Sequence, residues 1–283
     1  MEEIGKVVVK SINIFGHNIT FNPEMLIMTW LVMIVILLLC FFATRKLAVI
    51  PTKIQSVFEI IIEFLKDVLE STLGKKDAPK FTPLIISIFV FVLVSNWIGI
   101  IPNILNFIGV LIAIIHKLFG GQVIIIKKSL TNIFISPPIG IWYDFLFKLP
   151  AIKEPTKFLS TDLSLALVIF FVVHINSIKS KGIGNYFKSY MEPLPSEGIW
   201  LYLFFLNPFF YLNVISQLAN TLSHAFRLFG NIFGGGIIIV IVSELLRYFL
   251  LPVGLFAFFG LFSGAIQAFV FTMLAISYIA QQK

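Results

Sequence analysis

The stretch that decides the fold runs from residue 199 to residue 243 and reads "IWLYLFFLNPFFYLNVISQLANTLSHAFRLFGNIFGGGIIIVIVS". It contains one charged side chain, Arg227, and the nearest charges outside it are Glu197 and Glu244. A helix that crosses a bilayer at right angles needs about 20 residues, so this stretch is too long for one such helix. Because proline cannot continue a helical hydrogen-bond ladder, we expect a break at Pro208 and one long tilted helix after it.

The composition of the whole chain indicates a membrane protein. Of its 283 residues, 58% are hydrophobic and 12% are charged, and the mean hydropathy is +0.99. A soluble domain carries about twice that share of charge. Segments that alternate apolar and polar residues, as in a membrane β-barrel, are absent from the sequence. We therefore predict an all-α protein that crosses the membrane several times.

We predict a single membrane domain over residues 1–283, with about five membrane-embedded helices. The last two are expected to be long, tilted and packed as a hairpin. One further helix has apolar and charged residues on opposite faces, which is typical of a helix lying on the membrane surface. The predicted segments are 24–44, 82–102, 162–178, 199–245 and 252–280 in the membrane, 52–73 on its surface, and 103–160 as a long loop with interfacial elements.

Several kinds of site and partner are disfavoured. Cys40 is the single cysteine, which excludes a disulfide framework, and the four scattered histidines do not suggest a metal site. The net charge of +7 comes mostly from loops beside apolar segments, so it gives no support to nucleic-acid binding. We expect no metal and no cofactor. The first twenty residues lack a signal-peptide pattern, and loop charges leave the orientation open.

Four polar residues around the arginine share one helical stripe. Asn220, His224, Arg227 and Asn231 are spaced by four, three and four residues. Snorkelling of Arg227 to the headgroups is disfavoured, because the charges at either end of the stretch are roughly 25 and 45 Å of helix away. Burial of a cation at mid-membrane costs from about 2.5 to over 10 kcal/mol. Its partner is therefore an acid of another segment, such as Asp162, or a group on another protein.

Glycines at four-residue spacing accompany this stripe and recur in the last helix. Gly230 and Gly234 form one such pair, and Gly260 and Gly264 form another, three residues before Gln267. Small residues at this spacing let helices approach closely. We expect the two helices to pack through their glycines, with Gly235 and Gly236 beside them, and Gln267 to lie near the arginine stripe.

Simpler roles exist for each polar residue alone. Asn231 and Gln267 would serve as hydrogen bonds between helices, and His224 as a structural donor. Together with a central arginine, the set indicates an ion pathway. An intramembrane enzyme is disfavoured, because no nucleophile–base pair, phosphate loop or His-Glu-x-x-His motif is present. A stand-alone secondary transporter or channel, with Arg227 binding an anionic substrate, is the alternative function.

Five segments resemble one known family. "NTLSHAFRLFGNIFGGG" (220–236) and "GLFSGAIQAFVFTMLAISYIA" (260–280) resemble the last two helices of subunit a, the stator channel subunit of the F-type ATP synthase membrane sector. "SIKSKGIGNYF" (177–187) resembles the cytoplasmic loop of its bacterial members, and "IPTKIQSVFEIIIEF" (50–64) and "FVLVSNWIGIIP" (91–102) its surface helix and following span.

The resemblance implies a function without a catalytic site of its own. The arginine would face a ring of c subunits, each with one mid-membrane carboxylate, between two offset half-channels that are each open to one side. Passage of protons, or of sodium, would drive rotation of the ring. The other partners implied are b-type peripheral stalk subunits and the rest of the complex, in a bacterial plasma (inner) membrane.

Two positions depart from the family pattern. Gly236 stands where many members have a glutamate nine residues after the arginine, and Ser216 stands where many have an acid eleven residues before it. We expect His224, Asp162 or Glu244 to replace these half-channel acids, or a water-filled space beside the glycines to suffice. The coupling ion is proton by default, with sodium left open.

Overall fold

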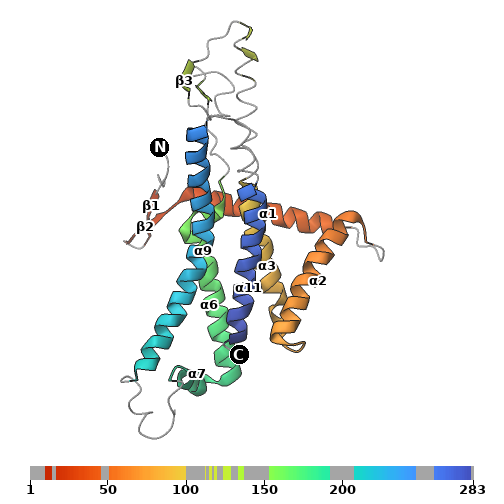
Figure 1. Cartoon of the computed structure of the whole chain (residues 1–283), viewed down its shortest axis with the longest axis vertical. Coiled ribbons are helices and arrows are strands. Elements are labelled where there is room, and N and C mark those ends of the chain that lie inside the picture. The colour runs from red at the N-terminus through yellow and green to blue at the C-terminus, as the bar shows by residue number, and fades with distance from the viewer. Residues whose placement is uncertain are drawn as a thin grey trace. The chain divides into compact units, whose positions relative to one another are not determined.

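The structure is a computed structural model, and it describes residues 10–14, 17–45, 51–99, 124–128, 133–136, 153–191, 207–246 and 258–281, with a few isolated residues between 112 and 119. These residues are mostly helical (Figure 1). The long helices are α1 (Pro23–Thr44), α2 (Lys53–Leu73), α3 (Ala78–Ile98), α6 (Leu159–Lys181), α9 (Pro208–Leu246) and α11 (Gly264–Gln281). The shorter elements are η1 (Pro155–Lys157), α7 (Ile183–Ser189) and a π-helical turn, η3 (Phe258–Ser263).

Within the described residues, four helical segments are long and apolar enough to cross a membrane: Pro23–Thr44, Ala78–Ile98, Leu159–Lys181 and Gly260–Gln281. The first of them exposes large apolar side chains such as Trp30, Leu37 and Phe42 on most of its surface. Exposed apolar surface of this extent is stable against lipid and unfavourable in water. The chain is therefore an all-α membrane protein, as the sequence predicts.

Helix α2 covers almost the whole of the predicted surface helix. It ends at Gly74, which has a φ of 82° and whose N–H donates to the Glu70 carbonyl. A positive φ is favourable for glycine, and it stops the helix there. Of the helices described, α2 is not among the segments apolar enough to span. Its position on the membrane surface stays a prediction.

Helix α9 begins at the proline where we expected the break. Asn207 caps it, because the Phe209 N–H donates to Asn207 Oδ1 over 2.9 Å, and the Asn207 amide in turn donates to the Met191 carbonyl. Asparagine is a favourable N-cap and proline a favourable first residue of a helix, since the first N–H groups have no partner within it. The dipeptide Asn207-Pro208 thus starts one helix of 39 residues.

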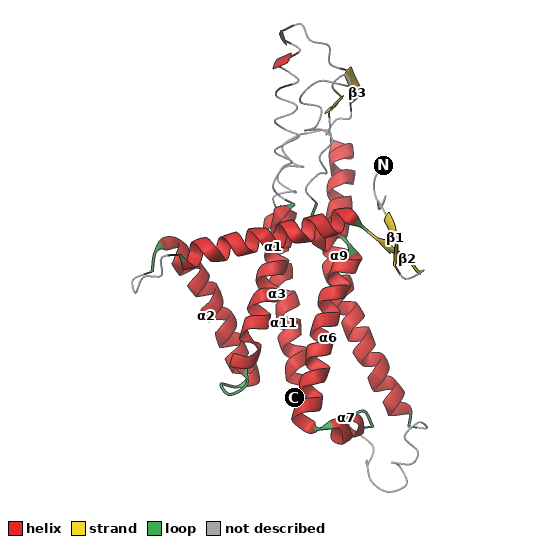
Figure 2. Ribbon diagram, turned by 180° about the vertical axis from the view of Figure 1, so that it is seen from behind, coloured by secondary structure: helices red, strands yellow, loops and turns green. Residues whose placement is uncertain are grey.

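Three local features differ from the sequence expectation. Gly182, with a φ of 79°, ends α6 and is followed by the short helix α7 where we expected a polar loop. Helix α11 begins at Gly264 after the π-helical turn, and residues 247–257 lie outside the described part. Two small antiparallel strand pairs, β1 (Lys10–Ile14) with β2 (His17–Phe21) and β3 (Ile124–Lys128) with β4 (Ile133–Ser136), were not predicted (Figure 2). Most of the predicted loop 103–160 also lies outside the description.

The chain forms two compact units, neither of which is one continuous stretch of sequence. Unit 1 comprises Met1–Leu37, Leu93–Lys157 and Ile232–Ala265, and unit 2 comprises Leu38–Val92, Phe158–Asn231 and Ile266–Lys283. They are therefore not successive domains along the chain. A single membrane domain over residues 1–283 stays a prediction.

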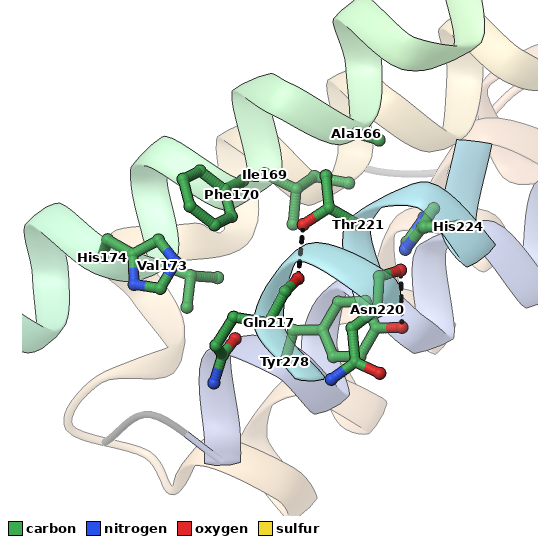
Figure 3. A pocket seen from close by; sticks show the side chains of 10 residues that line it. All are labelled: Ala166, Ile169, Phe170, Val173, His174, Gln217, Asn220, Thr221, His224 and Tyr278. Carbon is green, nitrogen blue, oxygen red and sulfur yellow. Dashed lines mark hydrogen bonds between the residues drawn. The ribbon is translucent and has the colours of Figure 1, made fainter. Parts of the chain in front are cut away.

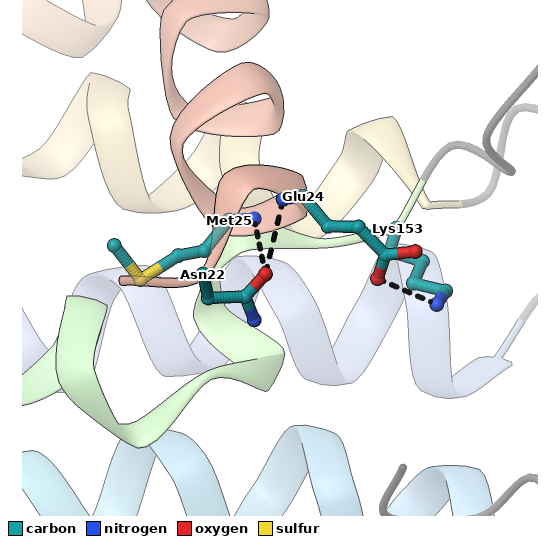
Figure 4. A network of polar contacts seen from close by, with 4 residues as sticks. All are labelled: Asn22, Glu24, Met25 and Lys153. Atoms are coloured by element: carbon teal, nitrogen blue, oxygen red, sulfur yellow. Dashed lines mark hydrogen bonds and ion pairs between the residues drawn. The ribbon is translucent and has the colours of Figure 1, made fainter. Parts of the chain in front are cut away.

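In unit 1, polar side chains join segments distant in sequence. The Asn96 amide donates to the Gly264 carbonyl over 2.9 Å and accepts from the Thr156 hydroxyl over 2.7 Å. At the start of α1, Asn22 Oδ1 accepts from the Glu24 and Met25 N–H groups, and the Glu24 carboxylate pairs with Lys153 at 2.9 Å (Figure 4).

Candidate functional site

The predicted polar stripe of α9 lies at the border between a buried and an exposed face of the helix. His224 is 2% exposed, whereas Arg227 is exposed. One row of exposed side chains is large and apolar: Tyr211, Ile215, Leu218, Leu222 and Phe226. The exposed residues of the neighbouring row, at three- and four-residue spacing, define what we call the open face of α9. They are Leu212, Ser216, Ala219, Ser223, Arg227 and Gly230. Most of these side chains are small, so another helix can approach this face closely.

Arg227 makes no ion pair with any residue that the structure describes. Asp162, the acid proposed from the sequence as its partner, is completely buried in the first turn of α6. Both Asp162 carboxyl oxygens lack a hydrogen-bond partner among the described residues. Asp162 and Arg227 both belong to unit 2, and no ion pair joins them there. Asp162 is therefore not the counter-charge of Arg227.

Helices α9 and α11 pack antiparallel within unit 2, and the contacts fix their register. The His224 ring lies edge-on to Phe271 with 3.8 Å between ring centroids. One turn earlier in α9, the Asn220 carbonyl accepts from the Tyr278 hydroxyl over 3.3 Å. Continuing one turn along α9 and back along α11 brings Gln267 level with Arg227. Gln267 is buried, and its Nε2 has no partner among the described residues.

A small cavity of about 20 Å³, enough for about one water molecule, opens beside this contact (Figure 3). Helix α6 lines it with Ala166, Ile169, Phe170, Val173 and His174, helix α9 with Gln217, Asn220, Thr221 and His224, and α11 with Tyr278. The wall therefore combines apolar side chains with several hydrogen-bonding ones. Within the described part of the chain, both ring nitrogens of His224 and Nε2 of His174 are buried without a partner.

One face of α6 connects the cavity with the buried acid. Asp162, Ala166, Ile169, Val173 and Ser177 are all buried and follow each other at spacings of four, three, four and four residues. Residues at this spacing lie on one side of a helix. Asp162 thus lies on the cavity-lining face of α6. It precedes Ile169, the residue in the middle of that face, by about two helical turns.

Among the described residues, the glycines that we expected to join the last two helices show no contact between them. A Cβ on Gly230 or Gly234 would meet no described heavy atom within 4 Å. A Cβ on Gly264 would instead meet Asn96 Cβ of α3 at 3.1 Å. The α9–α11 contact is made by His224, Phe271 and Tyr278, because bulky rings fill the space between the two helices there.

The two positions that depart from the family pattern have different surroundings. Ser216 is on the open face of α9. A Cβ on Gly236 would lie 3.9 Å from the Lys157 ammonium nitrogen, in unit 1. Gly235 is buried, and Gly260 is part of the π-helical turn. The side chain of Glu244 lies outside the described part of the chain.

Sequence reasoning missed several residues of the cavity and its surroundings. His174 was visible only as one polar residue in an apolar span, and Gln217, Thr221 and Tyr278 lie outside the stripe that we singled out. Tyr186 and Tyr190 follow in what we expected to be a loop. Helical spacing could not have found His174, because the twelve residues between it and Asp162 make about three and a third turns.

Comparison with known proteins places this arrangement in a family. The family described as "ATP synthase A chain" matches residues 26–280. The chain belongs to this family.

Relatives named ATP synthase subunit a are similar over most of their length. The one from Moorella thermoacetica is 31% identical over 252 residues, which cover 89% of this chain and 87% of the relative. Those from Bacillus subtilis and Desulforamulus reducens are 27% and 26% identical, covering 94% and 93% of this chain and 93% and 80% of the relatives. As a member of the ATP synthase A chain family with several candidate spans, the chain is a multi-pass membrane protein that works within a complex of several subunits.

Proposed function

We propose that the chain is the non-catalytic stator ion-channel subunit of an F-type ATP synthase, in a bacterial plasma membrane, and that Arg227 meets a carboxylate of a rotating c-subunit ring. The observation that carries the proposal is the exposure of Arg227 without an ion pair in the described part of the chain. A cation facing lipid without a partner is strongly unfavourable. A partner from outside the chain removes that cost.

The open face of α9 supports a partner of helical shape. Ser216, Ala219, Ser223 and Gly230 flank the guanidinium with small side chains, which suits the close approach of another transmembrane helix. A mid-membrane carboxylate on that helix would pair with Arg227. The neighbouring cation favours the charged form of the carboxyl group, so the ring residue gives up its ion as it reaches the arginine.

Two offset half-channels would then couple ion flow to rotation. An ion entering by one half-channel neutralises a ring carboxylate, which moves through lipid until it reaches the other half-channel. Arg227 blocks direct passage between the two. The membrane potential contributes about 2.3 kcal/mol per charge per 100 mV to each step. Peripheral stalk subunits of b type would hold the chain against the rotating ring.

Asp162 and His224 are our candidates, with Glu244, for the polar groups of the half-channels that lack acids at Gly236 and Ser216. Asp162 and His224 are both buried with unpartnered polar atoms in the described chain, on helices that line one cavity. Burial of such polar groups is unfavourable in free energy unless water or an ion binds to them. The cavity beside His224, on whose lining face of α6 Asp162 also lies, would form one part of a water-filled access path in unit 2.

The substitution Arg227→Ala in the assembled complex tests the proposal. We expect ATP synthesis and ATP-driven pumping by membrane vesicles to be lost, while ATP hydrolysis by the soluble sector continues. Arg45→Ala, which removes an exposed arginine at the end of α1, is the matched control and should leave pumping unchanged. Retained synthesis in Arg227→Ala would show that the arginine is not the coupling residue.

A further inference from the structure

A hydrogen-bonded chain of three side chains joins α7 to α6 in unit 2. The hydroxyl groups of Tyr190 and Tyr186 lie 2.7 Å apart, and the Tyr186 hydroxyl lies 2.8 Å from His174 Nδ1. Tyr186 and His174 are each about 8% exposed, and Tyr190 is half-buried just after the end of α7. The chain therefore runs from the partly accessible end of α7 into the interior of the unit.

The inner end of this chain reaches the cavity. His174 lines the cavity, and its second ring nitrogen, Nε2, has no partner among the described residues. His224 lines the same cavity from α9, also without a described partner for either ring nitrogen (Figure 3). The cavity has room for about one water molecule, which could hydrogen-bond to the polar groups of its wall.

Each member of this chain can both accept and release a proton. A tyrosine hydroxyl donates one hydrogen bond and accepts another, and a neutral imidazole carries a proton on one nitrogen and accepts at the other. Burial, together with the hydrogen bond to Tyr186, raises the pKa of Tyr190 above its ordinary value. The Tyr190 hydroxyl therefore gives up its proton only when it receives another proton in exchange.

We propose that Tyr190, Tyr186 and His174, continued by water in the cavity to His224, form a proton relay that serves one half-channel. The proposal rests on the proposed function and deepens it, because it names the ion and the side chains that carry it. His224 precedes Arg227 by three residues, so the relay ends one turn from the coupling residue.

The relay moves protons without any net change in its members. A proton enters at the Tyr190 oxygen as the Tyr190 proton passes to Tyr186 and the Tyr186 proton passes to His174 Nδ1. His174 releases its Nε2 proton to cavity water, which leaves the Nδ1–H tautomer. Rotation of the hydroxyl groups and of the imidazole ring then restores the starting arrangement. Each transfer breaks one O–H or N–H bond and forms the next. With 2.7 and 2.8 Å between the donors and acceptors, a sodium ion has no room in this chain.

The same residues also pack as an aromatic cluster, and the test must separate packing from proton transfer. The His174 and Phe170 rings are 4.0 Å apart, and those of Tyr186 and Tyr190 are 5.2 Å apart. Tyr186→Phe keeps the ring and removes the hydroxyl. His174→Gln keeps a side chain that hydrogen-bonds and removes the titrating ring. Ser189→Ala is the matched control, because it removes an α7 hydroxyl that donates to the Tyr186 carbonyl, outside the relay.

The experiment measures ATP-driven proton pumping and ATP hydrolysis by the assembled complex in inverted membrane vesicles, in sodium-free buffer. We expect Tyr186→Phe and His174→Gln to slow pumping about a hundredfold or more, the range for loss of one positioned proton-transfer group. ATP hydrolysis should slow in proportion, because the substitutions slow proton passage but leave pumping coupled to hydrolysis. The amount of assembled complex and the rates of Ser189→Ala should match the wild type.

Three results would overturn the relay. The first is wild-type pumping in both Tyr186→Phe and His174→Gln while Arg227→Ala abolishes it, which leaves the proposed function standing. The second is loss of pumping with undiminished hydrolysis, which indicates a structural leak. The third is pumping that requires sodium. If Tyr186→Phe does not assemble, Tyr190→Phe and His174→Gln decide by the same criteria. Pumping that survives Arg227→Ala would instead overturn the proposed function.

Discussion

At the scale of single residues, the carboxyl group of Asp162 is fully buried, and both its oxygens lack a partner among the described residues. A buried polar group without a hydrogen bond destabilises the fold. We predict that Asp162→Asn raises the thermal stability of the complex in detergent, since it replaces an acid with a neutral side chain of the same shape. We also predict that it slows ATP-driven pumping about a hundredfold or more, because an amide cannot bind and release the ion as the acid does.

The control for Asp162→Asn is Ser164→Ala, which removes an exposed hydroxyl from the next turn of α6 and should change neither property. Unchanged pumping in Asp162→Asn would remove Asp162 from the pathway. If Glu244→Gln and His224→Ala also left pumping intact, none of the three residues would replace the half-channel acids. A water-filled space without a protein acid would then have to serve instead.

At the scale of elements, Gly264 sets the approach of α11 to α3 in unit 1. A Cβ there would lie 3.1 Å from Asn96 Cβ, and Asn96 also donates to the Gly264 carbonyl. We predict that Gly264→Ala lowers the free energy of unfolding by about 1–3 kcal/mol, because the added methyl group separates the two helices. Thermal unfolding of the detergent-solubilised complex measures the effect.

Gly184→Ala is the matched control for Gly264→Ala. A Cβ on Gly184, in the short helix α7, would meet no described atom within 4 Å. Alanine also favours a helix over glycine by about 1 kcal/mol. The control should therefore match or exceed the wild-type stability. Equal stability of Gly264→Ala and the wild type would show that α3 and α11 do not depend on this close contact.

The element that bears Gly236 offers a further prediction. Because a Cβ on Gly236 would lie 3.9 Å from the Lys157 ammonium nitrogen, we expect Gly236→Glu to form an ion pair with Lys157. The pair should stabilise the chain by about 0.2–1 kcal/mol relative to Gly236→Gln, since Lys157 is exposed. A double-mutant cycle with Lys157→Met measures this coupling. A coupling of zero would mean that the two side chains do not meet.

At the scale of the whole molecule, the function depends on other subunits. Arg227 is exposed without an ion pair among the described residues, and the chain belongs to a family of ATP synthase subunits. We predict that the purified chain in lipid vesicles transports neither protons nor small anions under an imposed membrane potential. Vesicles that contain the whole complex are the control and should pump protons. Transport by the chain alone would favour the alternative of a stand-alone transporter.

The sequence by itself determined the long apolar helices and the unusual residue, Arg227. Long apolar stretches indicate membrane-embedded helices, and the Asn207-Pro208 pair placed the start of α9, because capping depends only on neighbouring residues. The spacing of Asn220, His224 and Arg227 likewise follows from helix geometry. These are local properties, so they can be derived without knowing how the helices pack.

The tertiary structure decided which of these residues meet. It separated Asp162 from Arg227, gave Gly264 a neighbour in α3 in place of α9, and joined His174 to Tyr186 and Tyr190. Each result depends on the rotation and register of helices far apart in the sequence, which the fit of bulky side chains sets. Periodicity tells which residues share a face, but it does not tell which helix that face will contact.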